Sequence, residues 1–277
     1  MKRKIKMIGM DLDGTLLTTK KELLPYTREI LRKAIDQGVV VLAATGRALS
    51  GVPQELLEFP GMRYVVTANG ARIIDQQSEN MILYEKLLPL EKANQLLDVF
   101  RKYDTLLEVY FDGRGYVSRE HLNKLSHYVP DPYMVNYISR TRTSVDDLEA
   151  LIQEKQAPMD KVQALFYDLK ERQTVLDEIE QWNDVSVAHA LAMNIEVNAG
   201  GVNKGSAMLR LGEMLGIRRE EIMACGDGNN DLDMLKTVGF AVAMKNAESS
   251  VKAAADYITG TNDEQGVAKA IEHFVLR

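Results

Sequence analysis

Two pairs of carboxylates stand just beyond short apolar segments near opposite ends of the chain. Asp11 and Asp13 come directly after the apolar run Ile5–Met10, and Asp227 and Asp231 come soon after a second such run. Runs of this length and composition predict buried strands. Open α/β sheets place their ligand sites just beyond the carboxyl ends of their strands. Aspartate and glycine also favour turns and helix caps, so either pair taken alone also fits an ordinary turn.

Four carboxylates at one edge of a sheet would repel one another strongly. At 4 Å and an effective dielectric constant of about 20, each pair of like charges costs roughly 4 kcal/mol. Such a group is stable only if a cation is bound or if some of its members are protonated. A small number of hard oxygen ligands indicates Mg²⁺, which binds one or two carboxylates and keeps waters or a substrate phosphate. The sequence therefore predicts a magnesium site at this edge.

Two further positions carry groups that suit an anion. Thr45 and Gly46 follow the apolar run Val39–Ala44, where a hydroxyl and backbone amides could hold a phosphate, although a helix cap is an alternative. Lys204 begins a predicted helix, and a cation at a helix amino terminus opposes the helix dipole. A nearby anion would explain that placement, while an exposed lysine in water remains the ordinary alternative.

The segments around these residues alternate between strand and helix patterns. Three apolar strands are predicted at Ile5–Met10, Val39–Ala44 and Tyr64–Ala68, and each ends in a polar or glycine-containing turn. The same alternation returns after residue 203, with the helix Lys204–Leu215 and the strand Glu221–Cys225. This pattern is typical of the α/β class, with a Rossmann-like parallel sheet as the core domain.

The middle of the chain follows a different pattern. Hairpin signals, such as Asp112–Gly113 between two short strands, alternate with helical stretches that include Ser144–Gln156, for which Ser144 is the predicted cap. We therefore expect an inserted α+β cap domain over residues 85–190. The core domain would then consist of residues 1–84 and 191–277.

Composition narrows the classes of partner and compartment. The chain has 277 residues and a net charge of −6, which gives no support for a nucleic-acid or anionic-membrane surface. One cysteine, Cys225, excludes an intrachain disulfide and fits a reducing compartment. The amino-terminal apolar run is too short for a signal peptide, so we expect a cytoplasmic protein. The oligomeric state is left open.

Several motifs taken together resemble a known family. The motifs DLDGT (Asp11–Thr15), ATGR (Ala44–Arg47), Lys204 in GVNKG, and GDGNND (Gly226–Asp231) resemble the four motifs of the haloacid dehalogenase superfamily. The stretches NGA (Asn69–Ala71), MKNA (Met244–Ala247) and NDEQGVAKAIEHF resemble the Cof-type phosphatases within that superfamily. A cap inserted between the second and third motifs resembles the type called C2.

This resemblance implies a Mg²⁺-dependent phosphatase that acts on small phosphorylated metabolites, above all sugar phosphates. Asp11 would attack phosphorus and form an aspartyl-phosphate, and Asp13 would act as the general acid and base. Mg²⁺ would be bound by Asp11, the backbone carbonyl of Asp13, and Asp227.

The resemblance also assigns supporting roles to six further residues. Thr45 and Gly46 would hold phosphate oxygens, and Lys204 would offset the negative charge between Asp11 and the phosphate. Asp231 and Asn230 would contact the metal ligands without binding the metal themselves, or would contact the phosphoryl group. Arg47 would face substrate or pair with a core carboxylate.

Other activities on related chemistry remain open. A phosphomutase or phosphotransferase would pass the phosphoryl group to an organic acceptor instead of water. A dehalogenase would be expected to lack the acid and base at Asp13. A phospho-receiver regulatory protein also uses an aspartate at a strand end with Mg²⁺, but it should lack both Asp13 and a large inserted cap.

Overall fold

The computed structural model describes residues 4–276, which form two compact units. The first unit comprises the chain up to Gly46, Pro53–Tyr84 and the chain from Asn203 onwards. The second unit comprises Arg47–Val52 and Glu85–Val202. The chain thus leaves the first unit twice and returns to it twice.

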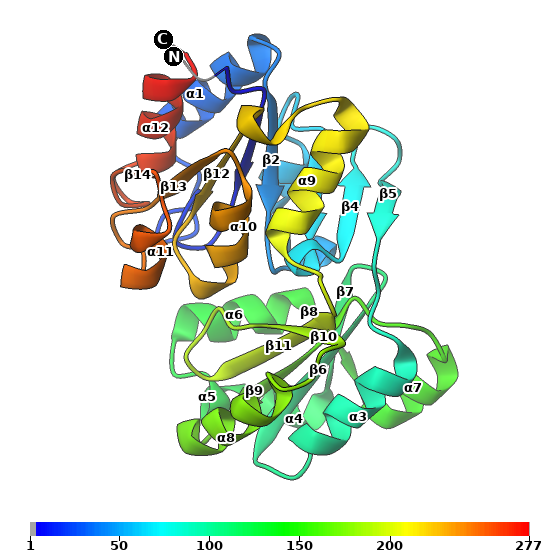
Figure 1. Ribbon diagram of the computed structural model, residues 1–277. Coiled ribbons are helices and arrows are strands. Elements are labelled where there is room, and N and C mark those ends of the chain that lie inside the picture. The colour runs from blue at the N-terminus through cyan, green and yellow to red at the C-terminus, as the bar shows by residue number, and fades with distance from the viewer. Residues whose placement is uncertain (1–3, 277) are drawn as a thin grey trace. The chain divides into compact units, whose positions relative to one another are not determined.

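An eight-stranded sheet is the centre of the first unit, with the strand order β14-β13-β12-β1-β2-β3-β4-β5 (Figure 1). The strands from β14 to β3 run parallel, and β4 is antiparallel to β3. Their bounds are β1 (Met7–Met10), β2 (Val40–Ala44), β3 (Tyr64–Thr67), β4 (Arg72–Asp75), β5 (Met81–Glu85), β12 (Ile222–Gly226), β13 (Phe240–Ala243) and β14 (Tyr257–Ile258).

Helices cover the sheet because its central strands are apolar on both faces. All four residues of β1 are buried, and a Cβ on Gly9 would stand 2.3 Å from the sulfur of Met208, so α9 packs directly on this strand. Helix α9 also packs against α10, and α1 packs against α12. The helices and helical turns of this unit are α1 (Pro25–Asp36), α2 (Gln54–Leu57), η2 (Ala68–Gly70), α9 (Lys204–Leu215), η3 (Arg219–Glu221), η4 (Asn229–Asp231), α10 (Leu232–Thr237), α11 (Ser249–Ala253) and α12 (Gly266–Phe274).

Local sequence signals set the ends of α9, the helix that carries Lys204. Asn203 caps the amino terminus by accepting a hydrogen bond from the Ser206 backbone N–H at 2.8 Å, and Ser206 Oγ accepts one in return from the Asn203 N–H. Gly216 ends the helix in the left-handed conformation, with φ +67°, that favours glycine. These caps fix the position of Lys204 at the first turn.

The second unit contains a six-stranded sheet with the order β10-β11-β9-β6-β7-β8. All neighbours are antiparallel except β7 and β8. The strands are β6 (Thr105–Phe111), β7 (Arg114–Ser118), β8 (Arg142–Val145), β9 (Lys161–Phe166), β10 (Val185–Ala188) and β11 (Asn194–Ala199). The helices are η1 (Leu49–Gly51), α3 (Leu90–Phe100), α4 (Arg119–Asn123), α5 (Leu125–Tyr128), α6 (Pro132–Thr141), α7 (Leu148–Lys155) and α8 (Leu169–Ile179).

The predicted fold class is confirmed, with a parallel-sheet α/β unit and an inserted α+β segment. The second predicted boundary, after residue 190, differs from the structure. Strand β11 pairs with β9 and β10, so residues up to Val202 belong to the second unit. The predicted cap at Ser144 is wrong, because Ser144 lies in β8 and Asp147 caps α7 by accepting from the Glu149 and Ala150 N–H groups.

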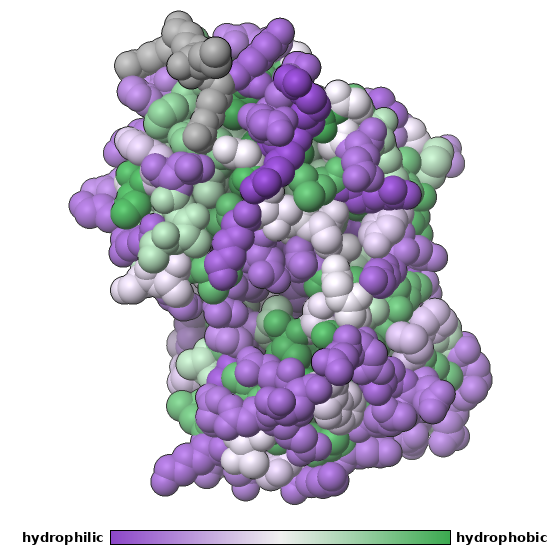
Figure 2. All heavy atoms as spheres, in the orientation of Figure 1, coloured by the Kyte–Doolittle hydropathy of each residue, from purple (hydrophilic) through white to green (hydrophobic). Residues whose placement is uncertain are grey.

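None of the helices formed by residues 4–276 has the length and apolar character that a membrane span requires. Hydrophilic side chains cover most of the face drawn in Figure 2, and apolar side chains appear among them in small groups. Apolar groups scattered in this way are normal on a folded protein.

Candidate active site

Three neighbouring parallel strands bring the predicted residues to one edge of the sheet. Met10 of β1 lies opposite Ala43 of β2 and Cys225 of β12. Asp11, the next residue, therefore stands level with the last residues of both neighbours. Thr45 is the first residue after β2, and Asp227 is the first residue after β12. The strand register thus gathers residues that are far apart in the sequence.

Lys204 provides the central ionic contact of this edge. Its ammonium Nζ donates hydrogen bonds to Asp11 Oδ1 at 2.6 Å and to Asp231 Oδ1 at 2.7 Å. The side chain of Lys204 is only 1% exposed, and that of Asp231 is fully buried. A buried ammonium is stable here because both carboxylates compensate for its loss of hydration. These two carboxylates are the nearby anions that the position of Lys204 in the sequence predicted.

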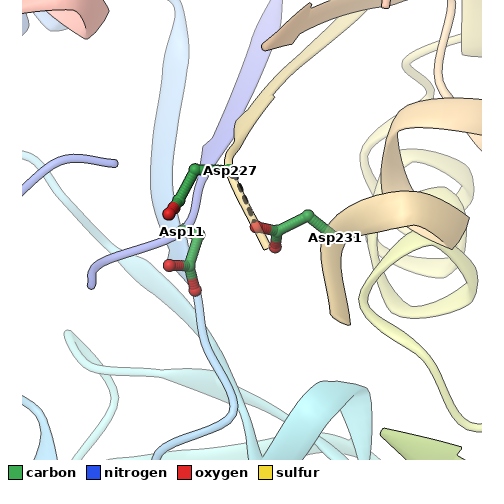
Figure 3. A group of neighbouring side chains, drawn as sticks. All are labelled: Asp11, Asp227 and Asp231. Carbon is green, nitrogen blue, oxygen red and sulfur yellow. Dashed lines mark hydrogen bonds between the residues drawn. The ribbon is translucent and has the colours of Figure 1, made fainter. Parts of the chain in front are cut away.

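Asp231 uses both of its carboxylate oxygens within the protein. Oδ1 accepts from Lys204, and Oδ2 accepts from the backbone N–H groups of Asp227 at 2.9 Å and Gly228 at 3.1 Å. Figure 3 shows the bond that joins Asp231 to the backbone of Asp227. These bonds hold the turn after β12 in a fixed shape.

Asp11, Asp227 and Asp231 each present a carboxylate oxygen within 4.8 Å of the others. The side chains of Asp11 and Asp227 extend from the ends of neighbouring strands toward the same space, and Asp231 approaches from the start of a helix (Figure 3). Because Asp231 is already hydrogen-bonded through both oxygens, Asp11 and Asp227 offer the freer ligand atoms. Hard oxygen donors in this arrangement could hold a divalent cation.

The turn after β1 packs tightly over Asp227. Thr15 Oγ donates to Asp227 Oδ1 at 2.5 Å. Gly14 has φ +81°, and a Cβ at that position would stand 2.2 Å from Asp227 Oδ2. Glycine is therefore required at residue 14 by both its backbone conformation and the close approach of a carboxylate.

Asp13 lies in the same turn but in a more open environment. Its side chain is 38% exposed and forms an ion pair with Lys21 Nζ at 2.7 Å. An exposed pair of this kind contributes little to stability. Asp13 is consequently the more accessible of the two aspartates in the DLDGT motif.

The remaining predicted residues lie in turns beyond the strands. Thr45 is buried, its N–H donates to the carbonyl of Val66 at 2.9 Å, and its carbonyl accepts from the Asn69 N–H at 3.0 Å. Gly46 and Asn230 are partly exposed. The turn that carries Thr45 is therefore fixed by main-chain hydrogen bonds while the next residue stays accessible.

Arg47 contacts two residues of the second unit. Its guanidinium lies 4.4 Å from the ring centroid of Tyr137 and donates to the carbonyl of Gly51 at 2.7 Å. All three of these residues belong to the second unit.

Sequence reasoning did not single out the residues that brace the turn after β1. Asn246 Nδ2 donates to the Gly14 carbonyl at 2.8 Å, and Asn262 Nδ2 donates to the Leu17 carbonyl at 3.0 Å. Asn246 Oδ1 in turn accepts from the Asn262 N–H at 3.1 Å. Asn246 lies in the MKNA stretch, and Asn262 begins the stretch NDEQGVAKAIEHF. Both stretches were noted for their resemblance to Cof-type phosphatases, but neither was given a structural role.

Burial and crowding change the acidity of the carboxylates. Burial raises the pKa of Asp11 to about 8 against the lowering effect of Lys204, and Asp231 and Asp227 add to the rise. Burial, followed by the charge of Asp231, raises the pKa of Asp227 to about 7. Burial lowers the pKa of Lys204, but Asp11 and Asp231 outweigh this effect and its net shift is upward. The site without a cation thus favours protonated carboxyl groups.

We expect the unfolding free energy of the protein in excess chelator to decrease between about pH 4 and pH 8. Unfolded carboxyls lose their protons near pH 3.8, whereas Asp227 and Asp11 in the folded state keep theirs to about pH 7 and 8. The folded state binds more protons within this window, so rising pH favours unfolding, by an amount on the order of several kcal/mol. Urea denaturation across the window measures the slope. The double variant Asp11→Asn, Asp227→Asn should flatten it, and an unchanged slope would contradict this origin.

Comparison with known proteins gives a consistent result over almost the whole chain. A family model described as haloacid dehalogenase-like hydrolase matches residues 8–271. The 5-amino-6-(5-phospho-D-ribitylamino)uracil phosphatase YcsE of Bacillus subtilis is 33% identical over 275 residues, which cover 98% of this chain and 96% of that protein. A haloacid dehalogenase-like hydrolase structure from B. subtilis is 28% identical with a TM-score of 0.86, and the match covers 98% of this chain and 100% of that one.

A further solved structure is the subclass IIB sugar phosphatase BT4131, which is 25% identical with a TM-score of 0.80. The match covers 97% of this chain and 98% of that one. The chain belongs to the haloacid dehalogenase-like hydrolase family, as the four motifs predicted. Within that family it is a phosphatase.

Proposed function

We propose that the chain hydrolyses phosphate monoesters of small sugar-like metabolites with the help of Mg²⁺, through an aspartyl-phosphate on Asp11. One observation carries this proposal. Asp11 stands at the end of the central strand, held by the buried Lys204 and within ligand distance of Asp227. A carboxylate fixed in this way is suited to in-line attack on phosphorus.

The donor set supports magnesium as the cofactor. Asp11 and Asp227 offer hard carboxylate oxygens, and the tight Gly14 turn closes directly over Asp227. The carbonyl of Asp13 lies in the same turn and would complete the set together with water and a phosphate oxygen. When bound, Mg²⁺ supplies positive charge that keeps Asp11 and Asp227 ionised and neutralises the phosphoryl oxygens.

The proposed reaction has two displacements at phosphorus. A carboxylate oxygen of Asp11 forms a bond to phosphorus while the ester P–O bond breaks, and the leaving oxygen takes a proton from Asp13. A water molecule then gives its proton to Asp13 and attacks the same phosphorus, which breaks the bond to Asp11 and releases phosphate. The exposure of Asp13 supports this role, because it must meet both an alcohol and water.

Three further groups would support both steps. Lys204 holds Asp11 in one orientation and offsets the negative charge that approaches it. Asp231 anchors Lys204 and the turn of Asp227, and Asn230 in that turn would contact the phosphoryl group. Thr45 and the amide of Gly46 would bind phosphate oxygens beside Asp11. These assignments follow the motif positions and are consistent with the strand register.

The sugar-like substrate class comes from the relatives. The protein YcsE is named for a phosphoester of a ribityl group, and BT4131 is named a sugar phosphatase. Both names describe a phosphate carried by a hydroxyl-rich carbon chain. We infer that this chain acts on esters of the same chemical kind.

Replacement of the proposed nucleophile tests the covalent step. Asp11→Asn should abolish phosphate release, because a neutral amide cannot form the aspartyl-phosphate, while the fold is retained. Phosphate release and circular dichroism on the same preparation measure both effects. The matched variant Asp36→Asn, on the exposed end of α1, should retain full activity. Undiminished turnover by Asp11→Asn would refute the nucleophile assignment.

The acid and base role of Asp13 predicts a dependence on the leaving group. Asp13→Ala should slow hydrolysis of sugar phosphates by about a hundredfold or more but slow aryl phosphates much less, because a phenolate leaves without protonation. Steady-state rates with ribitol 5-phosphate and p-nitrophenyl phosphate give the comparison. Equal losses on both substrates would count against leaving-group protonation.

The metal requirement can be tested by removal and return. Excess chelator should stop turnover, and Mg²⁺ should restore it, because the carboxylates of Asp11 and Asp227 otherwise repel each other and the phosphate. Mg²⁺ should also raise the thermal midpoint of the wild type but not that of Asp227→Asn. Activity that persists in chelator would exclude the metal from the reaction.

A further inference from the structure

The short loop that joins β3 to β4 has an uncommon backbone conformation. Ala68, Asn69 and Gly70 have φ angles of +48°, +59° and +106°, the only run of three positive values within residues 4–276. A left-handed backbone brings Cβ close to the following carbonyl oxygen, so it is costly for alanine, tolerated by asparagine and free for glycine. Such residues persist only where their surroundings hold them, and they concentrate at functional sites.

This loop is also buried, although loops ordinarily lie on the surface. Ala68, Asn69 and Ala71 are 1%, 3% and 0% exposed. Glu79 and Asn80, which are the left-handed residues of the next loop along the chain, are exposed. Reversal of the chain between two strands does not require burial of the loop. The cause of its conformation therefore lies in the groups that pack against it.

One of these groups is the carbonyl of Thr45, directly after the neighbouring strand β2. Ala44 of β2 pairs with Val66 of β3, so a regular parallel ladder would bring the Ala68 N–H to that carbonyl. The left-handed turn advances the chain by one residue, and the Asn69 N–H donates instead, at 3.0 Å. The N–H of Thr45 in turn donates to the Val66 carbonyl at 2.9 Å. The chain at the end of β3 therefore binds both main-chain groups of Thr45.

The second group is the main chain at the amino terminus of α9. A Cβ on Gly70 would stand 2.3 Å from the carbonyl oxygen of Asn203 and 3.2 Å from the Cβ of Ala207. The closer contact is with backbone, so no side chain can rotate away to relieve it. Asn203 caps α9 and directly precedes Lys204, whose ammonium binds Asp11. The close fit at Gly70 therefore fixes the position from which the Lys204 side chain extends.

We propose that the turn Ala68–Gly70 is a positioning element that sets the separation between Thr45 and Lys204. The turn and both of these residues belong to the first unit. This inference rests on the proposed function, in which Thr45 and Lys204 act on the same phosphoryl group. Asn69 holds the main chain of Thr45, and Gly70 holds the main chain beside Lys204. A phosphoryl group meets both side chains at the correct distance only while the left-handed turn is kept.

The variant Gly70→Ala tests this inference in the full chain. An added Cβ must displace the turn or the start of α9, and a shift of about 1 Å can cost about a hundredfold in rate. The kcat/KM for p-nitrophenyl phosphate should fall about ten- to a hundredfold. An equal fall is expected with ribitol 5-phosphate, because the turn acts on the phosphoryl group that both esters share. The Kd of inorganic phosphate, measured by calorimetry with Mg²⁺ present, should rise about tenfold.

Gly38→Ala is the matched control for these measurements. Gly38 follows α1 with φ +80°, and a Cβ there would meet no atom within 4 Å. The control therefore places alanine in the same backbone region without a steric contact. It should lower the thermal midpoint but leave kcat/KM and phosphate binding within about twofold of the wild type. Loss of stability is in this way separated from loss of positioning.

A pair of substitutions at Asn69 separates the backbone from the side chain. Asn69→Gly keeps both the N–H group and the left-handed conformation, so kcat/KM should stay within about twofold of the wild type. Asn69→Ala keeps the N–H group but disfavours the conformation, so kcat/KM should fall about fivefold or more. This pair also decides the question if Gly70→Ala does not fold.

Two results would overturn the inference. Unchanged kcat/KM and phosphate affinity in folded Gly70→Ala would show that the turn only joins β3 to β4. Equal losses in Asn69→Gly and Asn69→Ala would show that the asparagine side chain matters and the turn conformation does not. If the wild type releases no phosphate from either ester, the proposed function fails instead, and calorimetry with phosphate still measures the effect of the turn.

Discussion

The buried ion pairs of Lys204 are the constraint on which the rest of the site depends. A single ammonium joins Asp11, at the end of the central strand, to Asp231, which fixes the turn of Asp227. Without it, the buried carboxylates of Asp11 and Asp231 and the partly buried carboxylate of Asp227 would face one another with no positive charge between them. The capped first turn of α9 places this charge against the usual preference of the helix dipole, because the local anions are stronger than the dipole.

The carboxyl-terminal part of the chain also supports the turn after β1. Asn246 and Asn262 bind main-chain carbonyls of the segment after β1, and Asp263 accepts from the backbone and hydroxyl of Thr19. The turn that holds Asp13 and Gly14 is thus braced from outside by residues far along the sequence. Rigid support of this kind keeps reacting groups within the narrow geometry that catalysis requires.

The two units carry different arrangements of charged groups. The first unit gathers three carboxyl groups around one ammonium, an arrangement whose oxygens could hold a divalent cation. The second unit buries paired charges on part of one sheet face, where Arg142 Nε donates to Glu108 Oε2 at 3.0 Å and Lys161 forms an ion pair with Glu196. Family membership establishes the reaction class, whereas the choice of substrate depends on individual side chains and not on the fold.

The sequence by itself determined the α/β class, the strand-end positions of the DLDGT and GDGNND aspartates and the hairpin at Asp112–Gly113, because these depend on local periodicity and turn chemistry. Only the tertiary structure decided the partners of Lys204, which are separated from it by 193 residues for Asp11 and 27 for Asp231. It also decided that β11 belongs to the second unit and that Ser144 lies in a strand. Such facts depend on which strands pair and what covers each face, and no local pattern of residues encodes that choice.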